Sequence, residues 1–236
     1  MAEWKKKCEV EWGLQGAPMP DGLDWKSTYE AKPLGRNLLK NPSPHGVSKD
    51  EPESDESAMD QRPMRGPIRF APEGDFIGWT TSTETIPEDR SGIPEGVVIC
   101  SSSRYSWFSL VQVVDLKAEG LWDELLDKFQ PEIVIQDWYQ DSQLQEQVYE
   151  LHVKLLGADK SKVISERSIL PTEDRNAESK TWKEVSHVFS GYGPGVRYVH
   201  FQHRLKNMSM DGMVRGFYET KSSDSSVIVK PTKTSS

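Results

Sequence analysis

The stretch QVVDLKAEGLWDELLDKFQPEIVIQDWY, residues 112–139, predicts a strand, a helix and a second strand in direct succession. QVVDL is a short β-branched run, and in AEGLWDELLDKF the apolar residues recur at helical spacing. Those apolar positions are Leu121, Leu125, Leu126 and Phe129, and the acidic positions expected to face water are Asp123, Glu124 and Asp127. Pro131 ends the helix. EIVIQDWY then alternates, so Ile133, Ile135 and Asp137 share one face of a strand.

The segments on either side of this stretch have the pattern of strands. YELHVKLL alternates, which is typical of a half-buried strand in an antiparallel sheet. The face expected to be buried carries Tyr149, Leu151, Val153 and Leu155. TWKEVSHVFS, VRYVHFQHRL and SSVIVK continue the pattern, with turns rich in Gly and Pro between them. Roughly ten strands with one or two short helices predict a mainly β fold, an antiparallel β-sandwich.

The chain is expected to divide into a tail, a domain and a second, short tail. Residues 1–34 are polar and weakly periodic, which predicts a flexible N-terminal tail. Its scattered tryptophans either dock on the domain surface or form a partner-binding arm, and they are Trp4, Trp12 and Trp25. Residues 35–231 form the domain, in which residues 46–75 are an acidic insertion predicted to be disordered. Residues 232–236 are expected to fray.

Composition and charge exclude several classes of protein. The net charge of −8 and the pI of about 5.3 argue against a nucleic-acid partner, because phosphate binding needs a basic face. Cys8 and Cys100 are the only cysteines and lie in different contexts, which favours a reducing compartment. The N-terminus lacks the apolar core of a secretory signal, and the longest apolar run is too short for a membrane span. The sequence therefore predicts a cytoplasmic protein.

The usual motifs of catalysis are missing from the sequence. GYGPGVR, residues 191–197, lies between two strands and lacks the P-loop lysine, which indicates a turn. His200 and His203 are three residues apart on a strand, so they point to opposite faces. No cysteine pair has zinc spacing, and no GxSxG elbow is present. We therefore predict no catalytic residue, no cofactor and no metal site, and hence a protein that is not an enzyme.

Aromatic residues near strand ends are the better indication of a binding site. They are Tyr105, Trp107, Trp138, Tyr139, Phe217 and Tyr218. At such positions an aromatic ring can stack on the C–H face of a sugar, or it can belong to the core. The residues alone leave both interpretations open.

Five segments in order resemble the F-box-associated domain family across residues 35–231. They are GRNLLKNP, VVDLKAEGLWDELLDKFQPEIVIQDWY, YELHVKLL, WKEVSHVFSGYGPGVRYVHFQH and DSSVIVKP. The resemblance implies a galactose-binding-like sandwich of jelly-roll type with about ten antiparallel strands and one or two short helices. In the best-known family members, loops at one end bind the inner chitobiose of N-linked high-mannose glycans. Those members act in the ubiquitination of misfolded glycoproteins.

The ligand-binding residues of the family carry over only in part. Its first aromatic falls on or near Tyr105, and its Tyr-Trp-Lys triplet falls on Met213, Val214 and Arg215. Val214 therefore stands where the family has its stacking tryptophan, and Arg215 keeps only the positive charge. Loss of a stacked aromatic costs about 1–3 kcal/mol, taking base stacking as a proxy, or about tenfold to a hundredfold in affinity. We expect N-glycan binding to be weak or lost.

The resemblance also bears on partners and function. Residues 1–34 lack the helical apolar pattern of an F-box, so the Skp1–cullin ligase is a partner by family only and direct docking is not expected. One function is a module that recognises a protein or glycoprotein client, linked by family to glycoprotein quality control and cell proliferation. The alternative is the role for which a similar group was named, a cell-surface receptor of fish nonspecific cytotoxic cells. Asn207 begins a glycosylation sequon that matters only after secretion.

Overall fold

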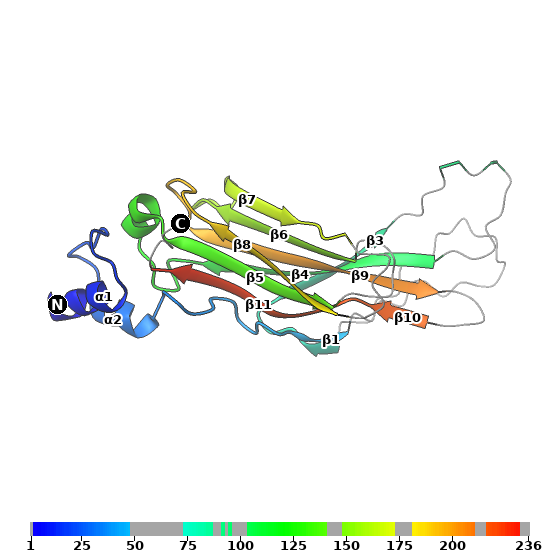
Figure 1. Ribbon diagram of the computed structural model, residues 1–236, viewed down its shortest axis with the longest axis horizontal. Coiled ribbons are helices and arrows are strands. Elements are labelled where there is room, and N and C mark those ends of the chain that lie inside the picture. The colour runs from blue at the N-terminus through cyan, green and yellow to red at the C-terminus, as the bar shows by residue number, and fades with distance from the viewer. Residues whose placement is uncertain are drawn as a thin grey trace.

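The computed structural model is a β-sandwich extended along one axis (Figure 1). It describes residues 2–47, 73–86, 91–92, 94–95, 103–140, 148–172, 181–210 and 216–231. The helices are α1 (Ala2–Glu11), α2 (Trp25–Ala31) and the π-helix η1 (Leu125–Phe129). The strands are β1 (His45–Val47), β2 (Glu73–Asp75), β3 (Thr80–Ile86), β4 (Ser103–Asp115), β5 (Glu132–Gln140), β6 (Tyr149–Leu156), β7 (Val163–Ile169), β8 (Trp182–Phe189), β9 (Tyr198–Met210), β10 (Gly216–Glu219) and β11 (Lys221–Lys230).

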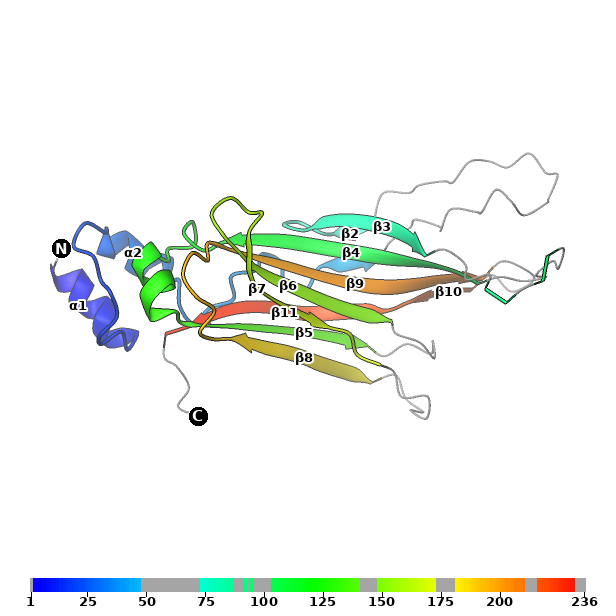
Figure 2. The ribbon, with the colours of Figure 1, turned by 90° about the horizontal axis from the view of Figure 1, so that it is seen from above.

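Two antiparallel sheets form the layers of the sandwich, and Figure 2 shows them edge-on. The large sheet has the order β3-β4-β9-β6-β7, with β10 also paired to β9, and the small sheet has the order β11-β5-β8. A short ribbon of β1 and β2 lies beside them. The chain changes layer between β10 and β11, where the Thr220 hydroxyl donates to the Lys206 carbonyl. The predicted antiparallel β-sandwich is confirmed.

The core lies between the sheets and follows the predicted alternation. On β6 the expected face is buried, and on β5 the buried face carries Ile133, Ile135 and also the acidic Asp137. Since side chains alternate along a strand, the intervening residues face outward and are more exposed. His200 and His203 also lie on opposite faces of β9, with only His203 completely buried.

The predicted order of strand, helix and strand in residues 112–139 is confirmed, but the helix is shorter and wider than expected. The Asp115 carboxylate accepts from the backbone N–H groups of Lys117 and Ala118, which forms a turn directly after β4. Gly120 has a φ of 103°, which a right-handed helix cannot contain. The helix η1 therefore begins later, and its end is closed by a bond from the Gln130 N–H to the Leu125 carbonyl.

Residues 2–31 form two helices that pack on the end of the sandwich, where a flexible tail was expected. Trp25 is 2% exposed and packs edge-on against Trp122, with ring centroids 5.0 Å apart. Burial raises the pKa of the Cys8 thiol on α1 to about 11. The tryptophans thus dock on the domain. Docking of the tryptophans was one of the two predicted alternatives, but the helix α1 was not predicted, because it has charged residues on all sides and no apolar stripe.

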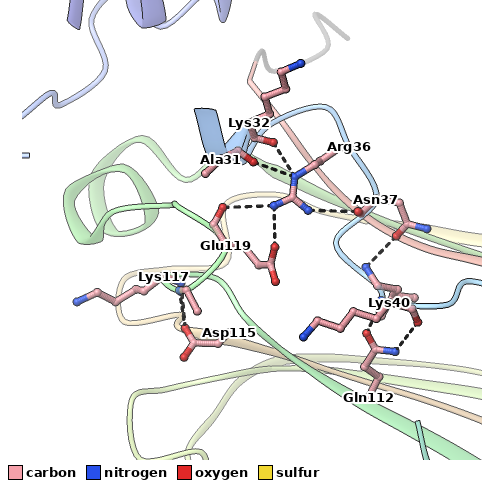
Figure 3. Close-up of polar contacts among 11 residues, drawn as sticks. Ala31, Lys32, Arg36, Asn37, Lys40, Gln112, Asp115, Lys117 and Glu119 are labelled. Atoms are coloured by element: carbon pink, nitrogen blue, oxygen red, sulfur yellow. Dashed lines mark hydrogen bonds and ion pairs between the residues drawn. The ribbon is translucent and has the colours of Figure 1, made fainter. Parts of the chain in front are cut away.

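The segment that follows α2 is fixed to β4 and its turn by polar contacts (Figure 3). The Arg36 guanidinium forms an ion pair with Glu119 at 2.7 Å and donates to the Lys32 carbonyl at 2.9 Å. The Gln112 amide bonds both the N–H and the C=O of Lys40, at 2.7 and 2.9 Å, in the manner of a neighbouring strand. These contacts connect the N-terminal helices to the large sheet.

Parts of the predicted domain division lie outside the described residues. These parts are residues 48–72 of the acidic insertion, the tail 232–236, and Cys100. The two ends of the insertion form the ribbon, in which Val47 pairs with Glu73. The boundaries at residues 35 and 231 stay predictions.

The acidic side of η1 contacts the turn at residues 191–197, whereas the sequence predicted acidic residues in water. The Asp127 carboxylate accepts from the Gly195 N–H at 2.8 Å and from two nitrogens of Arg197 at 2.8 and 2.9 Å. Asp123 forms a second ion pair with Arg197 at 2.9 Å. Hydrogen bonding to Arg197 holds the pKa of Asp127 below its ordinary value.

We expect Arg197→Ala to lower the free energy of unfolding by about 1–3 kcal/mol at pH 7, because it leaves a partly buried carboxylate without its partner. Since the pKa of Asp127 is lower in the folded state, its contribution is present above its unfolded pKa of about 3.9 and is lost as pH falls. Urea unfolding at neutral and acidic pH should show the deficit of the variant shrinking in acid. The control Lys117→Ala, which breaks an exposed ion pair with Asp123, should cost under about 1 kcal/mol.

Candidate functional site

The predicted ligand-binding residues are placed only in part by the structure. The backbone of Tyr105 lies near the start of β4, where it pairs with Ile86 and Met208. Met213, Val214 and Arg215 lie outside the described residues. The residues that flank this triplet, Met210 and Gly216, pair with each other, and Met210 also pairs with Ser103. Tyr105 and both ends of the triplet's segment therefore lie at one end of the large sheet, which we call the loop end.

A cavity of about 310 Å³ opens between the two sheets near the loop end. Figure 2 shows β9 and β10 reaching beyond the ends of β5 and β8, so that the large sheet overhangs the small one. The floor of the cavity is apolar and comprises Phe76, Phe108, Leu110 and Leu205. The rim is more polar and includes Ser43, His45, Trp182, Thr220, Lys221, Ser222 and Ser223.

Strand alternation produces the apolar floor. Phe108 and Leu110 lie on the core face of β4 and are 5% and 2% exposed, and Phe76 packs edge-on against Phe108 at 5.7 Å. The cavity therefore offers an apolar surface inside a rim of hydroxyl groups.

Trp182 is the aromatic residue on the rim, and the sequence reasoning missed it. It is the first residue of β8, is 45% exposed and pairs with Gln140 at the end of the small sheet. Its position after the polar segment TEDRNAESK was the signal that pointed to a strand end. The described rim carries the cationic Lys221 and the titratable His45 but no carboxylate. The arrangement suits a ligand with an apolar group and hydrogen-bonding groups around it.

The other aromatic candidates are less suited to binding. Tyr139 is 1% exposed and stacks on Tyr149 with centroids 4.5 Å apart, so it belongs to the core. Trp107 has the Arg204 guanidinium 5.0 Å from its ring centroid, and Arg204 is held by Glu84 and Glu150. That cation already occupies the vicinity of the ring. The side chains of Phe217 and Tyr218 lie outside those the structure describes.

A buried polar network joins the two sheets around Asp137. Its carboxylate accepts from the Ser225 hydroxyl at 2.8 Å, from His203 Nδ1–H at 2.8 Å and from the Tyr149 hydroxyl. Burial, followed by the charge of Asp137, holds the pKa of Tyr149 well above its ordinary value. His203 also stacks on Trp79, with centroids 5.0 Å apart and planes 4° from parallel. Asp137 and His203 are completely buried, so this network is structural.

Two further features limit the chemistry of the described residues. Among them, no group of three or more His, Cys, Asp or Glu side chains is arranged to hold a metal ion. None of the described helices combines the length and apolar character needed to cross a bilayer.

The fold and the loop end define a β-sandwich binding domain, and comparison with known proteins gives its family. The model of the family described as "F-box associated region" matches residues 29–229, and the chain belongs to this family. It is 56% identical to F-box only protein 50 of Danio rerio, over 99% of this chain and 98% of that protein. It is 40% identical to F-box only protein 50 of Homo sapiens, over 93% of this chain and 72% of that protein.

More distant relatives extend the same family. F-box only protein 2 of Bos taurus is 32% identical over 97% of this chain and 70% of that protein. Among solved structures, TmCBM61 in complex with β-1,4-galactotriose aligns over 83% of this chain and 99% of its own, at 14% identity and a TM-score of 0.33. That likeness is too low to support a functional conclusion.

Proposed function

We propose that the chain is a non-enzymatic binding module that recognises a protein or glycoprotein client at the loop end. The observation that supports this function is the cavity with an apolar floor and the half-exposed Trp182, at the same end as Tyr105. Aromatic residues at such positions contribute large apolar areas to binding and lose little side-chain entropy. We extend the proposal to ubiquitin-dependent quality control of glycoproteins and to cell proliferation, which the family resemblance implies; the relatives carry the name F-box only protein.

Affinity capture from cytosol tests this function. Tyr105→Ala and Trp182→Ala should each reduce the captured client about tenfold or more, the size of effect expected of binding hot spots. Val113→Ala, at an exposed position of β4 remote from the loop end, is the matched control and should capture as much as wild type. Equal capture by all of these variants would place the client elsewhere.

We propose further that N-glycan binding is weak or lost, because Val214 offers no aromatic surface at the position where the family resemblance implies a tryptophan. On a glycan array the wild-type chain should show little signal for chitobiose or high-mannose glycans. The variant Val214→Trp should increase that signal about tenfold to a hundredfold, the value of one stacked ring. Tight chitobiose binding by the wild type would overturn this proposal.

The proposed location is the cytoplasm, and the proposed link to the Skp1–cullin ligase is indirect. Residues 2–31, which precede the matched family region almost entirely, are occupied in packing against the sandwich. Co-purification of the chain with Skp1 and cullin in a stoichiometric complex would contradict the indirect link. Glycan attached to Asn207 in native protein would instead favour the cell-surface role.

A further inference from the structure

The two edges of the small sheet differ in how they are covered. Along β11, the backbone N–H groups of Gly35 and Leu38 donate to the carbonyls of Val229 and Val227 at 2.9 and 2.8 Å. At β8, no described residue forms a backbone hydrogen bond with the outer side of Glu184–Phe189. Figure 2 shows β8 as the outermost strand of its layer. The described residues thus leave the outer row of backbone groups of Glu184–Phe189 without a strand partner.

The strand β8 also lacks two of the features that usually prevent edge pairing, proline and a bulge, although it carries the adjacent charges Lys183 and Glu184 near its start. It contains no proline, and its pairing with β5 runs without a bulge from Trp182 to Phe189. By contrast, the pairing of β7 with β6 has an irregular register. Val188 of β8 is 45% exposed, as is Trp182. A straight, partly apolar edge of this kind is a ready template for another strand.

The order of residues on β8 is complementary to itself. We propose that β8 pairs antiparallel with β8 of a second copy of the chain, centred on Val185, and joins the two small sheets into one continuous sheet. In this register Glu184 of each copy lies opposite Ser186 of the other, and Trp182 lies opposite Val188. The outer face then has no like charges opposed, and its two most exposed apolar residues meet.

Neighbouring registers are less favourable. Centring the pair on Glu184 opposes two carboxylates, and centring it on Ser186 puts Glu184 against Val188. A centre between two residues is excluded, because it would put inward-facing and outward-facing side chains opposite each other. Of the registers centred on Glu184, Val185 and Ser186, the one on Val185 avoids these conflicts.

The inward face of β8 is compatible with the same register. Val185 meets Val185 of the second copy, and His187 lies opposite Lys183. Burial, with a smaller effect of Arg167, lowers the pKa of His187, so its ring is neutral at pH 7 and does not repel the lysine. On neither face of the interface do two like charges therefore lie opposite each other.

Two substitutions at Ser186 test the register, because they should change the dissociation constant of the dimer in opposite directions. Ser186→Glu places a carboxylate opposite Glu184 at two symmetric positions, so the dissociation constant of the dimer should rise about 2- to 30-fold. Ser186→Lys should lower it by a similar factor. The measurement is sedimentation equilibrium of the full chain over a concentration series. Thr80→Glu and Thr80→Lys, at an exposed position on β3, are matched controls that should leave the constant unchanged.

A charge reversal completes the test. Glu184→Lys combined with Ser186→Glu restores opposite charges across the proposed interface, so it should dimerise at least as well as wild type. A wild-type chain that stays monomeric throughout the concentration series would overturn the proposal. This holds also if the edge of β8 binds extended client peptides instead. Shifts of the same sign for Ser186→Glu and Ser186→Lys would also overturn it. Client capture is judged by Tyr105→Ala, which lies outside the proposed interface, because Trp182 belongs to both sites; failure of the dimer therefore leaves the proposed function standing.

Discussion

The variant Asp137→Ala is expected to lose about 3–5 kcal/mol of the free energy of unfolding, because it removes one partner from a buried charged network. Three donors then lose their acceptor in a site without water-exposed surface. They are the Ser225 hydroxyl, the Tyr149 hydroxyl and His203 Nδ1–H. Urea denaturation at pH 7, followed by tryptophan fluorescence and circular dichroism, measures the loss. For a single domain this is a large fraction of the total stability.

Two control variants distinguish the loss of the buried hydrogen bonds from the loss of side-chain volume. Asp137→Asn keeps the volume and one acceptor oxygen, and Tyr149 can reorient its hydroxyl to accept from the new amide. It should therefore lose less than the alanine variant, about 1–3 kcal/mol. Gln136→Ala removes the neighbouring side chain on the outward face and should stay within about 0.5 kcal/mol of wild type. A loss below about 1 kcal/mol for Asp137→Ala would contradict the buried network.

The coupling between partners can be measured directly. When Asp137→Ala is combined with Tyr149→Phe, the combined loss should be smaller than the sum of the single losses by about 0.5–3 kcal/mol. The reason is that the phenylalanine removes the hydroxyl that the alanine variant leaves unpaired. Strict additivity would mean that the hydroxyl does not depend on Asp137 for its partner.

This network shows which part of the fold can be predicted from sequence. Alternation in EIVIQDWY correctly places Asp137 on the same face as Ile133 and Ile135, and the structure buries all three. The partners of Asp137 come from β6, β9 and β11, up to 88 residues away in the chain. The alternation of side chains shows which face of its strand a residue lies on, but not which strands meet across the core. The sequence therefore could not identify the partners of Asp137.

The helix predicted within residues 112–139 is longer than the observed one, and the reason is local. Leu121, Leu125 and Leu126 are buried as the helical spacing predicted. The positive φ of Gly120 and the turn held by Asp115 shorten the helix, and neither is visible in a pattern of apolar residues. The backbone conformation of a glycine depends on what packs around it, here Ala31 of α2.

The candidate site stays a prediction, and its location can be compared with the structure only through neighbouring residues. Chain order and family motifs placed Tyr105 and the segment of Met213–Arg215 near each other, and the pairing of Ser103, Met210 and Gly216 agrees with that location. Trp182 was not predicted as a binding residue, because every second residue of a strand at the surface faces water whether or not it binds a ligand. Its importance comes from the overhang of the large sheet, which depends on relative strand lengths.

Trp122→Ala is expected to lose about 3–5 kcal/mol of the free energy of unfolding, the usual range for deleting a buried tryptophan side chain. Trp122 is 3% exposed and packs edge-on against Trp25. Its indole N–H donates to the Pro18 carbonyl at 2.7 Å. The indole therefore holds the N-terminal segment against the sandwich. The variant should also increase hydrogen exchange of the amides in α1 and α2, because their packing surface is lost.

The size and location of the effect distinguish a docked segment from a flexible tail. Trp122→Phe keeps a ring against Trp25 but loses the bond to Pro18, so it should cost less than the alanine variant and leave α2 mostly protected. Trp12→Ala is the matched control, since its ring is only half-buried and stacks on Tyr29 of α2 at 5.9 Å. It should increase exchange in α1 with a smaller loss of global stability. If α1 exchanges at the rate of an unfolded chain in wild type, and Trp122→Ala leaves that rate unchanged, the N-terminal residues do not contribute to the fold.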